Sequence, residues 1–202
     1  MWFVIFLAAA LAAAAFAPLE RTLGINARLV YFHGAWVWAA LITFVAAALM
    51  GLAGLLSRRA SLHHWSLALG RTAIVFWLAF LPMSLLVMQA NWNGLFLDEP
   101  RFRVPLNFAI VGVLLQVGVS FFPPVWASLA NLVFGVALLA GLRSAGTVLH
   151  PESPIFGSGA TGIQIYFAGL VLLLALAAWQ IARLWRSWEL RKSPRQKVAN
   201  AG

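Results

Sequence analysis

Residues 29–56 read LVYFHGAWVWAALITFVAAALMGLAGLL, and this stretch decides the fold. It contains no Asp, Glu, Lys or Arg over its whole length. A helix of about 20 predominantly apolar residues crosses the roughly 30 Å hydrocarbon core of a bilayer. The stretch is therefore predicted to be a membrane-spanning helix.

Five other stretches meet the same criterion. They cover residues 2–17, 71–90, 104–122, 125–142 and 161–185. Each run is continuously apolar, whereas strands of a membrane barrel alternate apolar and polar side chains. The sequence thus predicts an all-α integral membrane protein with six transmembrane helices. In this interpretation residues 1–190 form one polytopic membrane domain, and residues 191–202 form a basic tail.

The first stretch ends in Ala15-Phe16-Ala17 before Pro18, which resembles a signal-peptidase site. Signal peptides carry a cationic segment before the apolar run, and Met1-Trp2-Phe3 has no cationic side chain. We therefore expect an uncleaved helix here, and cleavage would not change the orientation of the other five.

The composition excludes several classes of protein. Hydrophobic residues make up 63% of the chain and charged residues 9%, against roughly 45–50% and about 25% in soluble domains. A chain this apolar has too little polar surface for a soluble globular domain and too much hydrophobicity for disorder. Cysteine is absent, which excludes disulfides and thiolate metal sites.

The basic residues set the expected orientation. Nine of the fourteen lie between residues 57 and 71 or after residue 182, and cytoplasmic loops carry an excess of Lys and Arg. Both termini are therefore predicted to be cytoplasmic, with outer loops at 18–28, 91–103 and 143–160. Membrane orientation then explains the positive charge, which does not indicate a nucleic-acid partner. His63 and His64 are expected in the cytoplasmic loop, at the membrane interface.

Two histidines are candidate metal ligands. His33 lies at the outer end of its predicted helix, and His150 lies in the last outer loop. Neutral imidazole is an axial ligand of heme iron, and two such ligands approach the porphyrin from opposite faces. The alternative is that each histidine only packs or caps a loop.

The middle outer loop contains the groups that a porphyrin needs. Residues 89–103 read QANWNGLFLDEPRFR, with apolar side chains for the ring and arginines for the propionates. The alternative is an ordinary interfacial segment with an aromatic belt. Four polar residues inside the predicted spans are expected to form hydrogen bonds between helices: Asn107, Gln116, Asn131 and Gln164.

The order of these features resembles the cytochrome c assembly proteins, most closely the heme exporter protein C (cytochrome c maturation protein C) type. The resemblance rests on residues 31–36 (YFHGAW), on the loop with Trp92, and on Leu149-His150. It departs from the family at Gly34-Ala35, which lacks the usual Pro. The loop also keeps only one Trp of several.

The resemblance implies heme b held transiently on the outer face of a bacterial inner (plasma) membrane, with His33 and His150 as axial ligands. Trp92, Phe96 and Trp36 would then pack on the ring. Either Asp98 or Glu99 matches the family's acid, depending on the alignment. The implied propionate partners are Arg28, Arg101 and Arg103. The implied protein partners are other cytochrome c maturation proteins or a heme chaperone.

Two other functions remain open at this point. One is a membrane accessory or anchor subunit of a respiratory or photosynthetic redox complex, with a degenerate heme site. The other, less favoured, is an integral heme b electron carrier, whose histidines usually lie well within helices. An enzyme is not expected, because the sequence contains no P-loop, HExxH or GxSxG motif.

Overall fold

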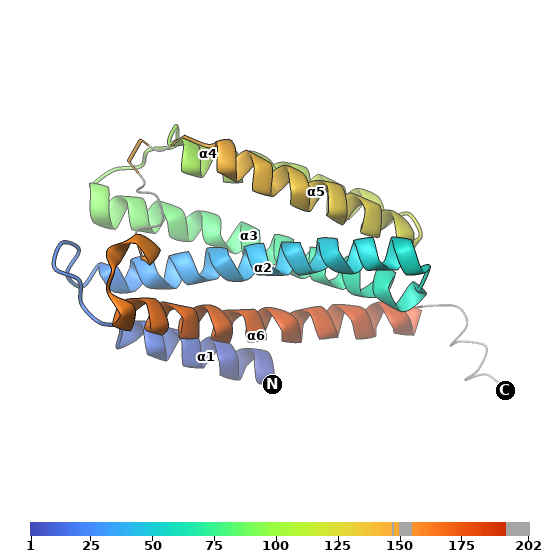
Figure 1. Ribbon diagram of the computed structural model, residues 1–202, viewed down its shortest axis with the longest axis horizontal. Helices are drawn as coiled ribbons and strands as arrows, with labels where there is room; N and C mark the ends of the chain where they lie inside the picture. The colour runs from blue at the N-terminus through green and yellow to red at the C-terminus, as the bar shows by residue number, and fades with distance from the viewer. Residues whose placement is uncertain (147, 150–154, 193–202) are drawn as a thin grey trace.

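The computed structural model describes residues 1–146, 148–149 and 155–192, and within these residues it is all-helical (Figure 1). The helices lie side by side along the long axis of the molecule. They are α1 (Trp2–Ala15), α2 (Ala27–Ser57), α3 (Ala60–Trp92), α4 (Pro100–Val119), α5 (Pro124–Ser144), the short 3-10 helix η1 (Phe156–Ser158) and α6 (Thr161–Lys192).

Five of these helices, α2 to α6, are long and apolar enough to cross a membrane. The chain is therefore a multi-pass membrane protein by the length and composition of its helices. Helix α1 has 14 residues, which gives it a length of about 21 Å. It lies beside only part of α6 (Figure 1), where the Tyr166 hydroxyl donates to the Ala13 carbonyl at 2.9 Å. The prediction of six full spans is confirmed for five helices.

The predicted loop around His63 and His64 is wrong. Helix α3 begins at Ala60, so both histidines lie within its first two turns. The turn from α2 consists of Arg58, in the left-handed conformation, and Arg59. The polar side chains of Ser61, His63, His64 and Ser66 lower the hydropathy of this stretch, but the helix runs through it and Ser66 is fully buried. Likewise, α6 extends two residues into the predicted tail.

Helix α2 is the centre of the bundle and packs against α3, α5, α6 and α1. Its buried positions are mostly small, which lets neighbouring helices approach closely in a membrane. They include Ala35, Ala39, Ala40, Ala47, Gly51 and Gly54. Aromatic rings fill the space between, as where Phe44 contacts both Trp77 and Phe134.

A buried polar chain links four helices. The Gln116 amide of α4 donates to Asn131 Oδ1 of α5 at 2.8 Å, and Asn131 Nδ2 donates to the Ser66 carbonyl of α3 at 2.8 Å. The Ser66 hydroxyl donates to the Ala47 carbonyl of α2 at 2.8 Å. The expected bonding between helices is thus confirmed for Gln116 and Asn131. Asn107 is exposed, and the Gln164 amide instead donates to the Phe156 carbonyl of η1.

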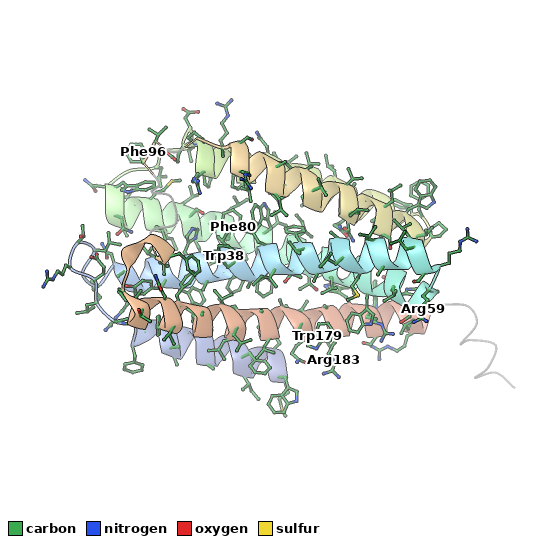
Figure 2. The ribbon with its side chains drawn as sticks, viewed as in Figure 1. Trp38, Arg59, Phe80, Phe96, Trp179 and Arg183 are labelled. Atoms are coloured by element: carbon green, nitrogen blue, oxygen red, sulfur yellow. The ribbon has the colours of Figure 1, made fainter. Side chains whose placement is uncertain are left out.

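The connecting segments divide between the two ends of the bundle. Segments 16–26 and 93–99 and the described parts of 145–160 lie together at one end, here called the loop end (Figure 1). The turns at 58–59 and 120–123 form the opposite end, here called the turn end. Figure 2 shows Phe96 at the loop end and Arg59 at the turn end. The three segments predicted as outer loops therefore share one end.

Candidate functional site

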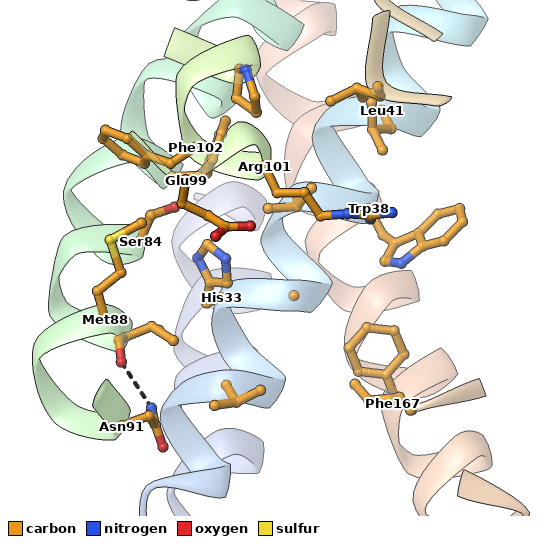
Figure 3. Close-up of a pocket in the computed structure, with 18 of the residues that line it drawn as sticks. His33, Trp38, Leu41, Ser84, Met88, Asn91, Glu99, Arg101, Phe102 and Phe167 are labelled. Carbon is orange, nitrogen blue, oxygen red and sulfur yellow. Dashed lines mark hydrogen bonds between the residues drawn. The ribbon is translucent and has the colours of Figure 1, made fainter. Parts of the chain in front are cut away.

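A cavity of about 440 Å³ opens at the loop end, between α2, α3 and the start of α4 (Figure 3). Leu142 of α5 and Phe167 of α6 close its sides, and Phe156 of η1 contributes to its edge. Ligand pockets for small molecules and cofactors usually measure roughly 300–1,000 Å³. The cavity is therefore large enough to hold a ligand.

One face of α2 forms a wall of the cavity. The lining positions are Val30, His33, Gly34, Val37, Trp38 and Leu41, a spacing that places them on one side of a helix. The last position is eleven residues after the first, so the wall is about 16 Å deep. At Gly34 a Cβ atom would lie 3.3 Å from the Phe167 ring, so the glycine gives α6 room beside this wall.

Helix α3 forms the opposite wall and the floor. Trp77 lies at the floor, fully buried, and its Nε1 donates to the Pro105 carbonyl of α4 at 3.0 Å. The aromatic rings of Phe80 and Trp92 stand above it on the same helix. The lining is thus predominantly apolar and aromatic.

A few polar groups converge within this apolar lining, which is the usual composition of a binding pocket. Figure 3 shows the His33 imidazole directly below the Glu99 carboxylate, with Arg101 extending from α4 toward Trp38. The Arg101 Nε and the Asn91 Oδ1 are buried and have no hydrogen-bond partner among the described residues. These two atoms are available to a ligand in the cavity.

Glu99 closes one end of the cavity. It is only 5% exposed, and its carboxylate accepts the backbone N–H groups of Leu149 at 3.0 Å and Val148 at 3.4 Å. A buried carboxylate requires such donors, because the loss of hydration is otherwise uncompensated. Glu99 also precedes α4, and its carbonyl accepts the N–H groups of Phe102 and Arg103. The loop before His150 is therefore attached to the start of α4.

The segments predicted as outer loops contain four acids, Glu20, Asp98, Glu99 and Glu152, which differ in their environments. Asp98 is fully exposed and lies 3.7 Å from Arg103, so Glu99 is the acid that lines the cavity. The Glu20 carboxylate accepts the backbone N–H groups of Leu23 and Thr22 in its own turn. These hydrogen bonds hold the pKa of its carboxyl below the usual value. Glu152 lies outside the described residues.

The structure brings together some of the predicted heme-site residues and separates others. His33, Trp92, Glu99 and Arg101 line the cavity. Phe96 does not, although its ring contacts Trp92 edge to face at 6.1 Å between centroids. Arg28 donates to the Ala17 carbonyl at 3.3 Å instead. His150 lies outside the described residues.

Trp36 turns away from the cavity and Trp38 takes its place. The Trp36 ring stacks on Phe76 at 4.5 Å, and its Nε1 donates to the Phe76 carbonyl at 2.8 Å. Trp38 lines the cavity and is 44% exposed, so it stands at the edge. The helical spacing from His33 did not contain this signal, since at about 100° per residue Trp36 lies nearer to His33 around the helix than Trp38 does.

No cluster of three or more His, Cys, Asp or Glu side chains suited to a metal ion occurs in the described ranges. A heme requires only one or two protein ligands to its iron. No known family model, curated protein or solved structure matches the chain.

Proposed function

We propose that this chain is a heme-binding membrane protein of c-type cytochrome biogenesis, which holds heme transiently in the cavity at the loop end. The observation that carries the proposal is the donor set of the cavity. An imidazole, aromatic walls and a buried guanidinium N–H without a partner occur together in one space. This set suits a flat apolar ring with a bound metal and acidic substituents.

Each side chain has a separate role in this proposal. His33 binds the iron, and Phe80, Trp92 and Trp38 provide apolar contact to the ring. Arg101 pairs with a propionate through its free donor. Glu99 lies beside His33 and orients the imidazole, as carboxylates commonly do for metal-bound histidines. His150 remains the predicted second ligand.

Heme is the cargo in this proposal, and it leaves for a cytochrome maturation partner or a heme chaperone. The edge of the cavity is compatible with release, because Trp38 and Phe156 are both exposed. The chain's own residues bind and orient the cargo, and no bond of the porphyrin is made or broken here.

Substitution of His33 tests the proposal. The wild-type protein, expressed with its partners in heme-replete cells, is expected to purify with bound heme visible as a Soret band. His33→Ala should lose most of this absorbance, because the described cavity then lacks its imidazole ligand. His64→Ala is the matched control, since His64 lies on α3 at the turn end, and it should retain the band.

A heme-free wild-type protein under these conditions would contradict the proposal. Stoichiometric purification with a redox complex, without heme on this chain, would favour the accessory-subunit alternative.

The proposal includes a finer topology, with six crossings, both termini in the cytoplasm and the loop end on the outer face of a bacterial inner membrane. A reporter that fluoresces only in the cytoplasm should be bright when fused after Gly202 and dark when inserted near Leu95. A bright reporter at Leu95 would show that the loop end faces the cytoplasm, which is the reverse of the proposed orientation. A dark reporter at the N-terminus, with a bright one at the C-terminus, would show five crossings and an α1 that does not span.

A further inference from the structure

The turn end carries a group of aromatic and basic side chains that the heme proposal does not use. Trp65 of α3 stacks on Trp179 of α6, with ring centroids 4.6 Å apart and planes at 9°. The Arg186 guanidinium lies 4.6 Å from the centre of the same Trp65 ring. Because Trp179 and Arg186 are two helical turns apart on α6, Trp65 is inserted between them.

This packing orients Arg186 without using all its donors. One Nη2 hydrogen bond reaches the Ser61 hydroxyl at 3.3 Å. The Nε atom is buried and has no hydrogen-bond partner among the described residues. A guanidinium presents its N–H groups as a planar fork that matches a phosphate or carboxylate. Arg186 is thus held in place by Trp65 and Ser61, and among the described residues no carboxylate pairs with its charge.

Arg183 lies on the same face of α6, one turn before Arg186. It is exposed, and its Nη1 donates to Gln180 at 3.3 Å. The acid of this region, Glu189, is already paired with Arg71. Within the described ranges neither Arg183 nor Arg186 has a carboxylate partner. The pair therefore carries two uncompensated positive charges.

The surroundings identify the source of the anion. Trp179 is 43% exposed beside Arg183 (Figure 2), and Leu184, the residue directly after Arg183, is also exposed. Trp and Arg together are typical of the membrane interface, and basic sites between transmembrane helices bind anionic lipid headgroups. A soluble phosphate would gain nothing from the exposed apolar side chains.

We propose that Arg183 and Arg186, with the Trp65–Trp179 stack, bind the phosphodiester of an anionic phospholipid in the leaflet at the turn end. The phosphate accepts guanidinium N–H groups of Arg186 and of the exposed Arg183. An acyl chain lies along Trp179 and Leu184. This site is independent of the cavity at the loop end.

The test measures how many lipid molecules stay bound to the full chain. Protein purified in micelles containing phosphatidylcholine and phosphatidylglycerol is analysed by native mass spectrometry, and retained phosphatidylglycerol is titrated. Arg183→Gln and Arg186→Gln should each weaken retention about fivefold. Arg186→Lys should restore part of it, because the charge returns without the planar fork.

The matched control is Arg143→Gln, an exposed arginine in the last turn of α5 at the loop end, which should leave retention unchanged. Arg183 contacts only its own helix in the described hydrogen bonds, so its variant should fold normally. Unchanged retention in Arg183→Gln and Arg186→Gln, or an equal loss in Arg143→Gln, would overturn the proposal. Displacement of the lipid by an equal concentration of inorganic phosphate would assign the site to a free anion and overturn it too.

Discussion

Gly51→Ala is expected to lower the free energy of unfolding by about 1–3 kcal/mol, as overpacked cores do. A Cβ atom at this position of α2 would lie 2.6 Å from the Ser128 backbone carbonyl oxygen of α5. Backbone cannot rotate away as a side chain can, so α5 would have to move. The same Cβ would lie 3.1 Å from the Ser66 hydroxyl, which belongs to the buried polar chain.

The measurement is reversible unfolding of the purified protein in mixed micelles, followed by circular dichroism. Gly118→Ala is the matched control, because it is also a helical glycine and nothing lies within 4 Å of its added Cβ. The control should be as stable as the wild type or slightly more so, since alanine favours helix over glycine. Equal stability of the two variants would show that α2 and α5 do not approach closely at Gly51.

Glu99→Ala is expected to reduce heme affinity by about 10- to 100-fold, the range found when outer-shell partners of metal ligands are removed. The carboxylate holds the N–H groups of Val148 and Leu149, and Figure 3 shows it beside His33. Its removal leaves these donors without their acceptor and frees the imidazole to rotate. Titration of the purified apoprotein with hemin measures the effect.

Asp98→Ala is the matched control, because this neighbouring carboxylate is fully exposed. It should bind hemin as the wild type does. A larger loss in Asp98→Ala than in Glu99→Ala would reverse the assignment of the cavity acid. Unfolding of both variants should be followed in parallel, so that a loss of fold is distinguished from a loss of binding.

The helices could be predicted well where the deciding property belongs to consecutive residues of the chain. A membrane requires long apolar segments that satisfy their own backbone hydrogen bonds, and residues 29–56 meet this requirement without reference to the rest of the chain. The prediction failed at the start of α3, where His63 and Ser66 are polar but lie inside the helix. Their partners are on another helix, since His63 contacts Ser128 at 2.7 Å and Ser66 contacts Ala47.

The cavity was only partly predictable. His33 and Arg101 were named from residue type, and both line it. The choice between Asp98 and Glu99 stayed open, because adjacent residues in a loop differ only in the direction of their side chains. Trp36 was named and Trp38 was not, although the packing of α2 against α3 turns Trp36 toward Phe76.

The sequence by itself determined that this protein belongs in a membrane, that it is built from long apolar helices, and which loops carry its polar residues. Apolar length and charge are local properties, so they can be read along the chain. Only the tertiary structure decided that a cavity opens at the end where these loops lie and that Glu99 is its buried acid. It also decided that Trp65 enters between Trp179 and Arg186. These facts depend on the approach and rotation of helices distant in sequence, which side-chain packing sets.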